Sequence, residues 1–394
     1  MNKQQEPRLR FRDFMGAWED RMLGKVADVR DGTHDSPIYQ NQGIPLVTSK
    51  NLTENGLDFS NVSLISQEDY EEINKRSKVE SGDILLGLIG TIGKPVLVKS
   101  GGYAIKNVGL IKELLEVKNE FLLPLLQSNI FETYVSRKNT GNTQKFLALD
   151  GLRSFEFLAP SLPEQTHLGN FFRRLDSQIA ESRAVLEKSR QLKKAMLAKM
   201  FPANGEKIPK IRFKGFEGEW ESRKLGDVVE IVMGQSPSST SYTDNPSDFI
   251  LVQGNADMKN GKVCPRVWTT ECIKLGAAGD IVMSVRAPVG DVGKTDYDIV
   301  VGRGVCAIKG NEFIYQTLWK MKLDGYWSSL SSGSTFEAIN SNDVKNSEIL
   351  IPIQEEQTAI GNFFRQLDET IALQSAEVEK LNQLKKGLLA AMLV

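Results

Sequence analysis

The sequence predicts an α+β fold that is built twice, as two tandem mixed α/β domains and two long helices related by an internal pseudo-twofold symmetry. The first observation is a repeat, because EQTHLGNFFRRLD at 164–176 returns as EQTAIGNFFRQLD at 356–368, in a chain of 394 residues. The second is a heptad pattern that begins in each copy and continues beyond it, and the third is a series of short β-type runs in front of each copy. A period near half the chain length indicates a duplicated architecture and not a solenoid of short repeats.

The repeat extends beyond these two segments. LRFRDFMGAWEDRMLG at 9–24 returns as IRFKGFEGEWESRKLG at 211–226. In the interiors, SGDILLGLIGTIG at 81–93 parallels AGDIVMSVRAPVG at 278–290 only in outline. We therefore expect each half to have the same frame around a different interior. A shared frame suits assembly, and two different interiors suit two different recognition tasks.

Each long helical segment has mainly apolar residues in alternating steps of four and three, which is the seam of a coiled coil. The seam positions are Leu168, Phe172, Leu175, Ile179 and Leu186 in the first helix, and Ile360, Phe364, Leu367, Ile371, Val378 and Leu381 in the second. Ser182, Ser189 and Gln374 interrupt the seam. About 37 residues at about 1.5 Å each give a rod of roughly 55 Å. A long folded segment between the rods allows an antiparallel coiled coil, and the alternative is that each helix packs only on its own domain.

In front of each long helix, short β-type runs cut by Gly, Asn and Pro predict strands, among them VTSKNL at 47–52 and DFILVQG at 248–254. Shorter helices are expected at 119–135 and 311–325. The predicted domain organisation is a first mixed domain at 1–160, a first long helix at 161–202, a second mixed domain at 203–352 and a second long helix at 353–394.

Composition sets broad limits on the function. Hydrophobic residues make up 40% of the chain, but no run approaches the roughly 18 apolar residues of a membrane span. The first residues, MNKQQEPRLRF, lack the apolar stretch of a signal peptide, so we expect a cytoplasmic protein. Three cysteines without C-x-x-C spacing predict neither a disulfide framework nor a zinc site. The net charge of −1 neither indicates nor excludes a nucleic-acid partner.

The order of the repeated segments resembles the specificity subunit of type I restriction–modification systems. RDGTHDSPIY at 30–39 is similar to one subtype of that family's target recognition domain, and MGQSPSSTSY at 233–242 resembles another. The resemblance implies that each mixed domain is a target recognition domain that reads one half of a bipartite sequence in double-stranded DNA. It also implies that the paired helices set the gap between the half-sites and dock two DNA adenine methyltransferase (modification) subunits. A restriction and translocase subunit is the further partner that it implies.

Catalytic motifs are weak, as a non-catalytic subunit of such an enzyme requires. An adenine methyltransferase of this kind needs an N-P-P-[YF] turn, whereas 245–248 reads NPSD. GLIGTIGKP at 87–95 has the wrong spacing for a phosphate-binding loop, with Pro95 where Ser or Thr should bind magnesium. We therefore expect no catalytic residue, no cofactor and no metal in this chain.

Candidate DNA contacts come from the differing interiors. Asn and Gln can pair bidentately with adenine, while Lys and Arg can meet guanine or phosphate. The candidates are Thr33, His34, Lys50, Asn51, Asn142, Thr143, Gln144, Lys145, Gln253, Asn255, Arg286, Arg303, Ser334 and Thr335. The alternative for the loop residues is a purely structural turn, and for the arginines it is pairing with an internal carboxylate. Segments 140–145 and 332–335 occupy equivalent places in the two halves, which favours a shared task such as contact with the DNA backbone.

Two other functions fit parts of the sequence. A stand-alone DNA-binding regulator with a pseudo-dimeric frame would bind its site tightly without partners. A coiled-coil scaffold without a role in DNA binding is less consistent with the sequence, because a scaffold gains nothing from two dissimilar domains.

Overall fold

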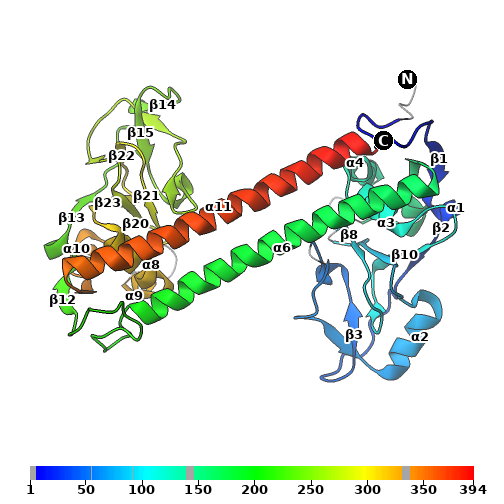
Figure 1. Cartoon of the computed structure of the whole chain (residues 1–394), viewed down its shortest axis with the longest axis horizontal. Coiled ribbons are helices and arrows are strands. Elements are labelled where there is room, and N and C mark those ends of the chain that lie inside the picture. Colours follow the sequence, from blue (N-terminus) through cyan, green and yellow to red (C-terminus); the bar gives the residue numbers. More distant parts are fainter. Residues whose placement is uncertain (1–5, 55, 91, 139–145, 331–337) are drawn as a thin grey trace. The chain divides into compact units, whose positions relative to one another are not determined.

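The chain forms two compact units (Figure 1). The computed structural model describes residues 6–54, 56–90, 92–138, 146–330 and 338–394. Unit 1 contains Met1–Ala184 together with Ala376–Val394, and unit 2 contains Val185–Ser375. Each unit therefore combines one mixed domain with the start of one long helix and the end of the other.

Unit 1 begins with a mixed domain of short strands and helices. Its elements are β1 (Glu19–Met22), α1 (Leu23–Val26), β2 (Ala27–Asp31), β3 (Ile44–Val47), η1 (Ser49–Asn51), β4 (Leu52–Thr53), β5 (Gly56–Leu57), β6 (Ser63–Ile65), α2 (Gln67–Ser77), β7 (Ile84–Gly87), β8 (Gly93–Leu97), β9 (Ala104–Ile105), β10 (Val108–Glu113), α3 (Asn119–Leu126), α4 (Asn129–Lys138), α5 (Leu149–Arg153) and β11 (Glu156–Ala159). The long helix α6 (Leu162–Met200) follows directly.

The central sheet of unit 1 has the strand order β2-β10-β7-β8, and a smaller sheet has the order β6-β3-β9. All four residues of β7 are buried, as expected for an apolar run covered on both faces. In the smaller sheet β3 pairs in parallel with β9, which aligns Leu46 with Ala104. This pairing brings together the carboxyl ends of two strands that lie far apart in the sequence.

Unit 2 repeats this plan with different loops. Its elements are β12 (Glu221–Lys224), α7 (Leu225–Val228), β13 (Glu230–Met233), η2 (Ser239–Ser241), β14 (Tyr242–Thr243), β15 (Phe249–Val252), η3 (Asn255–Asp257), β16 (Met258–Lys259), β17 (Lys262–Val263), β18 (Trp268–Thr269), β19 (Leu275–Gly276), β20 (Ile281–Ser284), β21 (Val292–Lys294), β22 (Ile299–Val301), β23 (Val305–Lys309), α8 (Glu312–Leu323), α9 (Tyr326–Leu330), α10 (Ser341–Lys345), β24 (Glu348–Ile351) and α11 (Gln354–Met392). The two larger sheets have the orders β13-β23-β20-β21-β17-β16 and β14-β18-β15-β22-β19. As in unit 1, a parallel pair (β15 with β22) brings two strand ends together.

The same polar contacts join the first segment of each domain to its helix. Arg10 donates two hydrogen bonds to Glu164, at 2.8 and 2.7 Å, and Arg212 donates two to Glu356, both at 2.7 Å. Both glutamates are buried in the first turn of a long helix, where the helix dipole favours a negative charge. Bidentate Arg–carboxylate pairs fix orientation as well as distance. The repeated sequence segments therefore make the same contacts in both units.

The long helices pack together within each unit, as the heptad pattern predicts. Leu168, Phe172, Leu175, Ile179, Leu186, Ile360 and Phe364 are buried, and Leu367, Ile371, Val378 and Leu381 are half-buried. The first seam residues also belong to the core of their own domain, so the alternative of packing on the domain holds for the start of each helix. The end of the other helix completes each core, with Leu389 and Met392 in unit 1 and Leu197 and Met200 in unit 2.

Two predicted elements differ from the structure. Residues 47–52 were predicted as a strand, but the strand ends at Val47 and a 3₁₀ turn follows, because Asn51 caps that turn. The helix predicted at 119–135 is two helices, α3 and α4. The break lies at Ser128, whose hydroxyl donates to the Leu125 carbonyl and accepts from the Ile130 amide.

Candidate nucleic-acid interface

The loop after β2 in unit 1 is held against the turn that follows β9. A Cβ atom on Gly32 would lie 2.2 Å from the Ile105 carbonyl oxygen, so only glycine allows this approach. The Thr33 amide donates to the same carbonyl at 3.0 Å, and the Asn107 amide donates to the Thr33 carbonyl at 3.1 Å. These contacts fix the position of the start of the loop that contains the predicted contacts Thr33 and His34.

His34 lies between two polar partners. Its Nε2 is 2.8 Å from Asp31 Oδ2, and its Nδ1 is 2.8 Å from Asn107 Oδ1. Asp31 is buried and also pairs with Arg76, whereas 58% of the His34 side chain is exposed. These contacts set the orientation of an imidazole whose edge still faces solvent. Both ring nitrogens are engaged within the domain, so contact of His34 with a base or a phosphate requires the exchange of one of these two hydrogen bonds.

The carboxyl ends of the parallel strands β3 and β9 form the edge against which the His34 loop lies. Lys50 and Asn51 follow β3 at this edge but differ in their surroundings. Lys50 is exposed. Asn51 is buried, accepts hydrogen bonds from the amide and the hydroxyl of Thr48, and donates one to the Asp58 carbonyl. Because the fold uses both polar atoms of the Asn51 side chain, Lys50 is the better placed of the two for contact with DNA.

Unit 2 forms the same edge from different residues. A Cβ atom on Gly234 would lie 1.9 Å from the Gly302 carbonyl oxygen, so this glycine plays the part of Gly32. Asp257 takes the place of Asn51, because its Oδ2 accepts from the amides of Gln253 and Gly254. The side chain of Gln253 donates to the Tyr242 hydroxyl at 2.6 Å, and Asn255 is half-buried.

Two predicted arginines lie at this edge of unit 2. Arg303 is in the turn between β22 and β23, whose glycines pack on Gln253, and Arg286 follows β20 next to it. The Val285 amide donates to the Gly304 carbonyl at 2.9 Å, which joins the two segments. Both arginines are exposed, and within the described ranges neither pairs with a carboxylate. Among the described residues, this edge therefore presents two guanidinium groups without a carboxylate partner, together with the side-chain amide of Gln253.

Several other predicted contacts cannot be placed in this way. Asn142, Thr143, Gln144, Lys145, Ser334 and Thr335 lie outside the described residues. Sequence reasoning missed Asn107 and Lys106, which lie in the turn against the His34 loop, with Lys106 Nζ 2.5 Å from Ser36 Oγ. Only the positive φ of 55° at Asn107, a conformation that asparagine tolerates, gives a local reason for that residue type.

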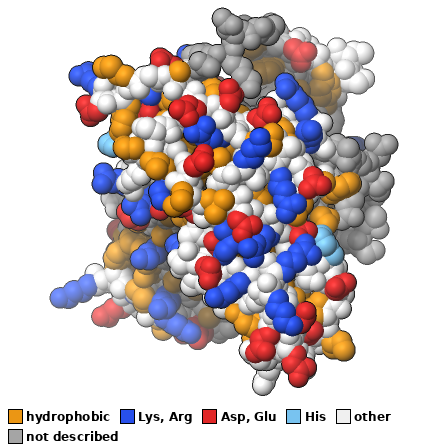
Figure 2. Space-filling model, turned by 90° about the vertical axis from the view of Figure 1, so that its right-hand side faces the viewer, with side chains coloured by type: hydrophobic (Ala, Val, Ile, Leu, Met, Phe, Trp, Pro, Cys, Tyr) orange, Lys and Arg blue, Asp and Glu red, His pale blue; other side chains and the backbone are white. Residues whose placement is uncertain are grey.

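Charge on the face drawn in Figure 2 is mixed, with Lys and Arg side chains interspersed with Asp and Glu.

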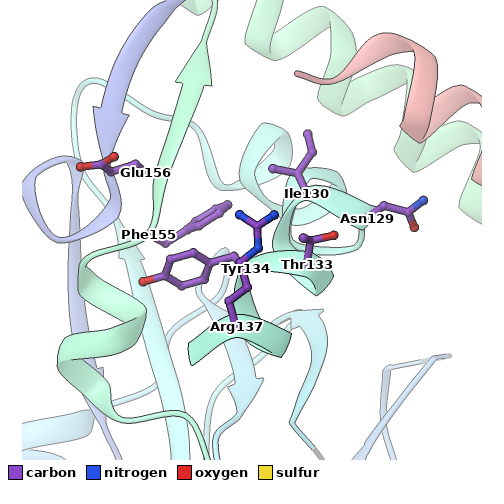
Figure 3. A pocket seen from close by; sticks show the side chains of 7 residues that line it. All are labelled: Asn129, Ile130, Thr133, Tyr134, Arg137, Phe155 and Glu156. Carbon is purple, nitrogen blue, oxygen red and sulfur yellow. The ribbon is translucent and has the colours of Figure 1, made fainter. Parts of the chain in front are cut away.

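A pocket of about 430 Å³ lies elsewhere in unit 1, against α4 and the start of β11 (Figure 3). The centroids of its Tyr134 and Phe155 rings lie 5.0 Å apart, and the Tyr134 hydroxyl donates to the Gly151 carbonyl, so these side chains serve the core.

In the described part of the chain, no group of three or more His, Cys, Asp or Glu is arranged to hold a metal ion. No helix there is long and apolar enough to cross a membrane.

Comparison with known proteins agrees with this duplicated plan. The model of the family described as type I restriction modification DNA specificity domain matches twice, at residues 15–188 and 217–383. Similar curated proteins include the MjaX specificity subunit of Methanocaldococcus jannaschii, 28% identical over 95% of this chain and 92% of that protein. The MjaVIII specificity subunit of the same organism is 23% identical over 81% and 80%.

Solved structures share the fold. The S subunit of a type I restriction–modification system from M. genitalium has a TM-score of 0.69 at 15% identity, with 99% of each chain covered. A structure from a study of the assembly and conformational transition of a type I restriction–modification system has a TM-score of 0.54 at 22% identity, covering 94% of this chain and 96% of that one. The chain therefore belongs to the type I restriction modification DNA specificity family and is the DNA specificity subunit of a type I restriction–modification system.

Proposed function

We propose that each unit reads one half of a bipartite DNA target and that the chain is itself non-catalytic. The observation that carries this proposal is that both units have an equivalent edge, which presents different side chains in each unit. In unit 1 the edge presents His34, Lys50 and Lys106, and in unit 2 it presents Gln253, Arg286 and Arg303. Equivalent placement supports one task performed twice, and different side chains support two different base sequences. Since the proposed target is cellular DNA, we expect the protein to be cytoplasmic.

We propose further that the outer faces of the long helices dock two DNA adenine methyltransferase subunits. Ten positions of α6, each two residues before a seam position, lie about 200° around the helix from the seam. For this comparison the seam is continued in the same steps to Lys193, Met196 and Met200 in α6 and to Lys385, Leu388 and Met392 in α11. Nine of the ten stripe residues are identical in α11, against five of the ten seam residues. The matched positions are Thr166, Asn170, Arg173, Ala180, Ala184, Glu187, Gln191, Lys194 and Ala198 in α6, and Thr358, Asn362, Arg365, Ala372, Ala376, Glu379, Gln383, Lys386 and Ala390 in α11. We call this set the outer stripe.

The outer stripe is exposed apart from Asn170, which is half-buried, so packing within the chain does not explain its identity in the two helices. A partner that binds twice does explain it, because two copies of one protein need two equal surfaces. Each unit presents the start of one stripe and the end of the other, and only the matched pair Ala184 and Ala376 falls entirely in unit 1. Three alanines in each stripe permit the close approach of a partner helix. A restriction and translocase subunit would join the resulting complex.

The stoichiometry of the complex tests this docking surface. Ala180→Arg is expected to reduce the bound methyltransferase from two copies to one, and Ala180→Arg with Ala372→Arg is expected to abolish binding, measured by native mass spectrometry. Gln178→Arg is the matched control, because it adds the same charge at an exposed position off the outer stripe. If both arginine variants still bound two copies, the outer stripe would not be the docking surface.

The alternative function is a stand-alone DNA-binding regulator. The dependence of DNA affinity on salt concentration distinguishes this regulator from a specificity subunit that works with a methyltransferase. A chain with a net charge of −1 neutralises few phosphates by itself, so its affinity should fall only slightly with salt. Addition of the methyltransferase should steepen that dependence and raise the affinity for the cognate site. Full specific affinity of the chain alone, with an equally steep dependence, would favour the regulator.

A further inference from the structure

Two lysine–aspartate pairs lie between the long helices at matching positions. In unit 2, Lys193 of α6 is 2.6 and 2.8 Å from the two carboxylate oxygens of Asp368 of α11. In unit 1, Lys385 of α11 is 2.6 Å from Asp176 of α6. Each residue stands 192 positions from its counterpart, so the pair is part of the repeat, with the helices exchanging roles.

Each pair also contacts the mixed domain of its unit. Lys193 Nζ lies 4.4 Å from the centroid of the Trp319 ring, and Gln316 donates to Asp368 Oδ2 at 2.8 Å, so α8 meets the pair in unit 2. In unit 1 Lys385 donates to Gln127 Oε1 at 2.7 Å, at the end of α3. In each unit, one lysine–aspartate pair therefore joins the two long helices and also contacts the mixed domain.

The alignment that the pairs require is the same in both units. The numbers of the paired residues add up to 561 in each case, as expected for one antiparallel register. Since α6 continues directly from the first domain and α11 from the second, each pair joins the first half of the sequence to the second half.

The lysines are strongly shielded from water. Only 7% of the Lys193 side chain and 16% of the Lys385 side chain is exposed, whereas 31% of Asp368 and 36% of Asp176 remain exposed. A shift of one helix along the other would leave a shielded ammonium group without its carboxylate, which is strongly unfavourable. Apolar seam residues do not discriminate in this way, because one heptad can pack in the place of the next.

We propose that Lys193–Asp368 and Lys385–Asp176 hold the two halves of the chain in one register and thereby hold the gap between the DNA half-sites at one length. This inference rests on the proposed reading of a bipartite target. The four residues are positioning residues, since they act on DNA only through the placement of the recognition domains. They trade stability for a single alignment, as buried polar residues do in coiled coils.

The test compares methylation rates of the complete complex on DNA duplexes with the cognate gap and with gaps one base pair shorter or longer. The variant replaces all four residues by leucine (K193L, D368L, K385L and D176L). Its preference for the cognate gap should fall at least roughly tenfold, because the unfavourable unpaired state no longer opposes a shift. The variant in which lysine and aspartate exchange places in both pairs should regain the preference. An unchanged preference in the leucine variant would overturn the proposal.

Stability and gap selection must be measured together. The melting temperature of the leucine variant should change little, because the loss of each half-buried ion pair is offset by the removal of the cost of shielding its lysine from water. If the fourfold variant does not fold, K193L with D368L alone is measured and should show part of the loss. Leu175→Ala is the control, since it should lower the melting temperature and leave the gap preference unchanged. A wild-type complex without any defined gap would instead refute the proposed bipartite reading.

Discussion

Lengthening both long helices should lengthen the gap between the half-sites. The change duplicates residues 179–182 after Ser182 and residues 371–374 after Gln374. Both insertions lie between the lysine–aspartate pairs of their helix, so both pairs can form as before. Matched insertions also keep the heptad faces of the two helices together.

The expected size of the effect follows from helix geometry. Four residues at about 1.5 Å add about 6 Å to each helix, which is close to two base pairs at about 3.4 Å each. They add about 40° beyond a full helical turn, against roughly 70° for two base pairs of DNA at about 10.5 per turn. The remaining mismatch of about 30° is small enough for DNA twist to absorb.

The assay is genome-wide mapping of methylated adenines in cells that contain the variant and its methyltransferase. The methylated motif should keep both half-sites and gain two unspecified base pairs. An insertion in α6 alone should abolish methylation, because it shifts one helix against the other. A motif with its original gap in the doubly lengthened variant would refute the idea that the helices set the spacing.

Two further predictions concern the candidate DNA contacts. His34→Ala should cost about 1–3 kcal/mol on the cognate site and relax one position of the first half-site, with little change in melting temperature. A clear drop in melting temperature with unchanged specificity would show that the contacts of His34 with Asp31 and Asn107 only order the loop. Arg303→Ala should cost about 1–3 kcal/mol of binding free energy on the cognate site and relax the second half-site alone. The measurement is a filter-binding comparison of cognate and random DNA. An equal loss on both DNAs would identify a phosphate contact instead.

The sequence predicts the frame well, because its signals are local and occur twice. The 3.5-residue seam predicts the first long helix at 161–202, and the structure has it at Leu162–Met200. The short interiors are harder to predict. The β-type run VTSKNL at 47–52 is predicted as one strand, and only the capping contacts of Asn51 show where the chain turns.

The candidate edges are predicted only in part for a related reason. The sequence indicates the His34 loop through its glycine, but not its partner Asn107, 73 residues away. That contact depends on the parallel pairing of β3 with β9, which local patterns do not reveal. Similarly, Arg303 is recognisable as a cation, but its position beside Gln253 follows from the pairing of β15 with β22.

Exchange of one recognition domain tests the central claim most directly. Residues 26–158 are replaced by the corresponding interior of another member of the family, residues 203–394 are kept, and methylated adenines are mapped with the same methyltransferase. Independent reading by the two units predicts that one half of the methylated motif changes and that the other half and the gap persist. A motif in which both halves changed, or neither did, would contradict it.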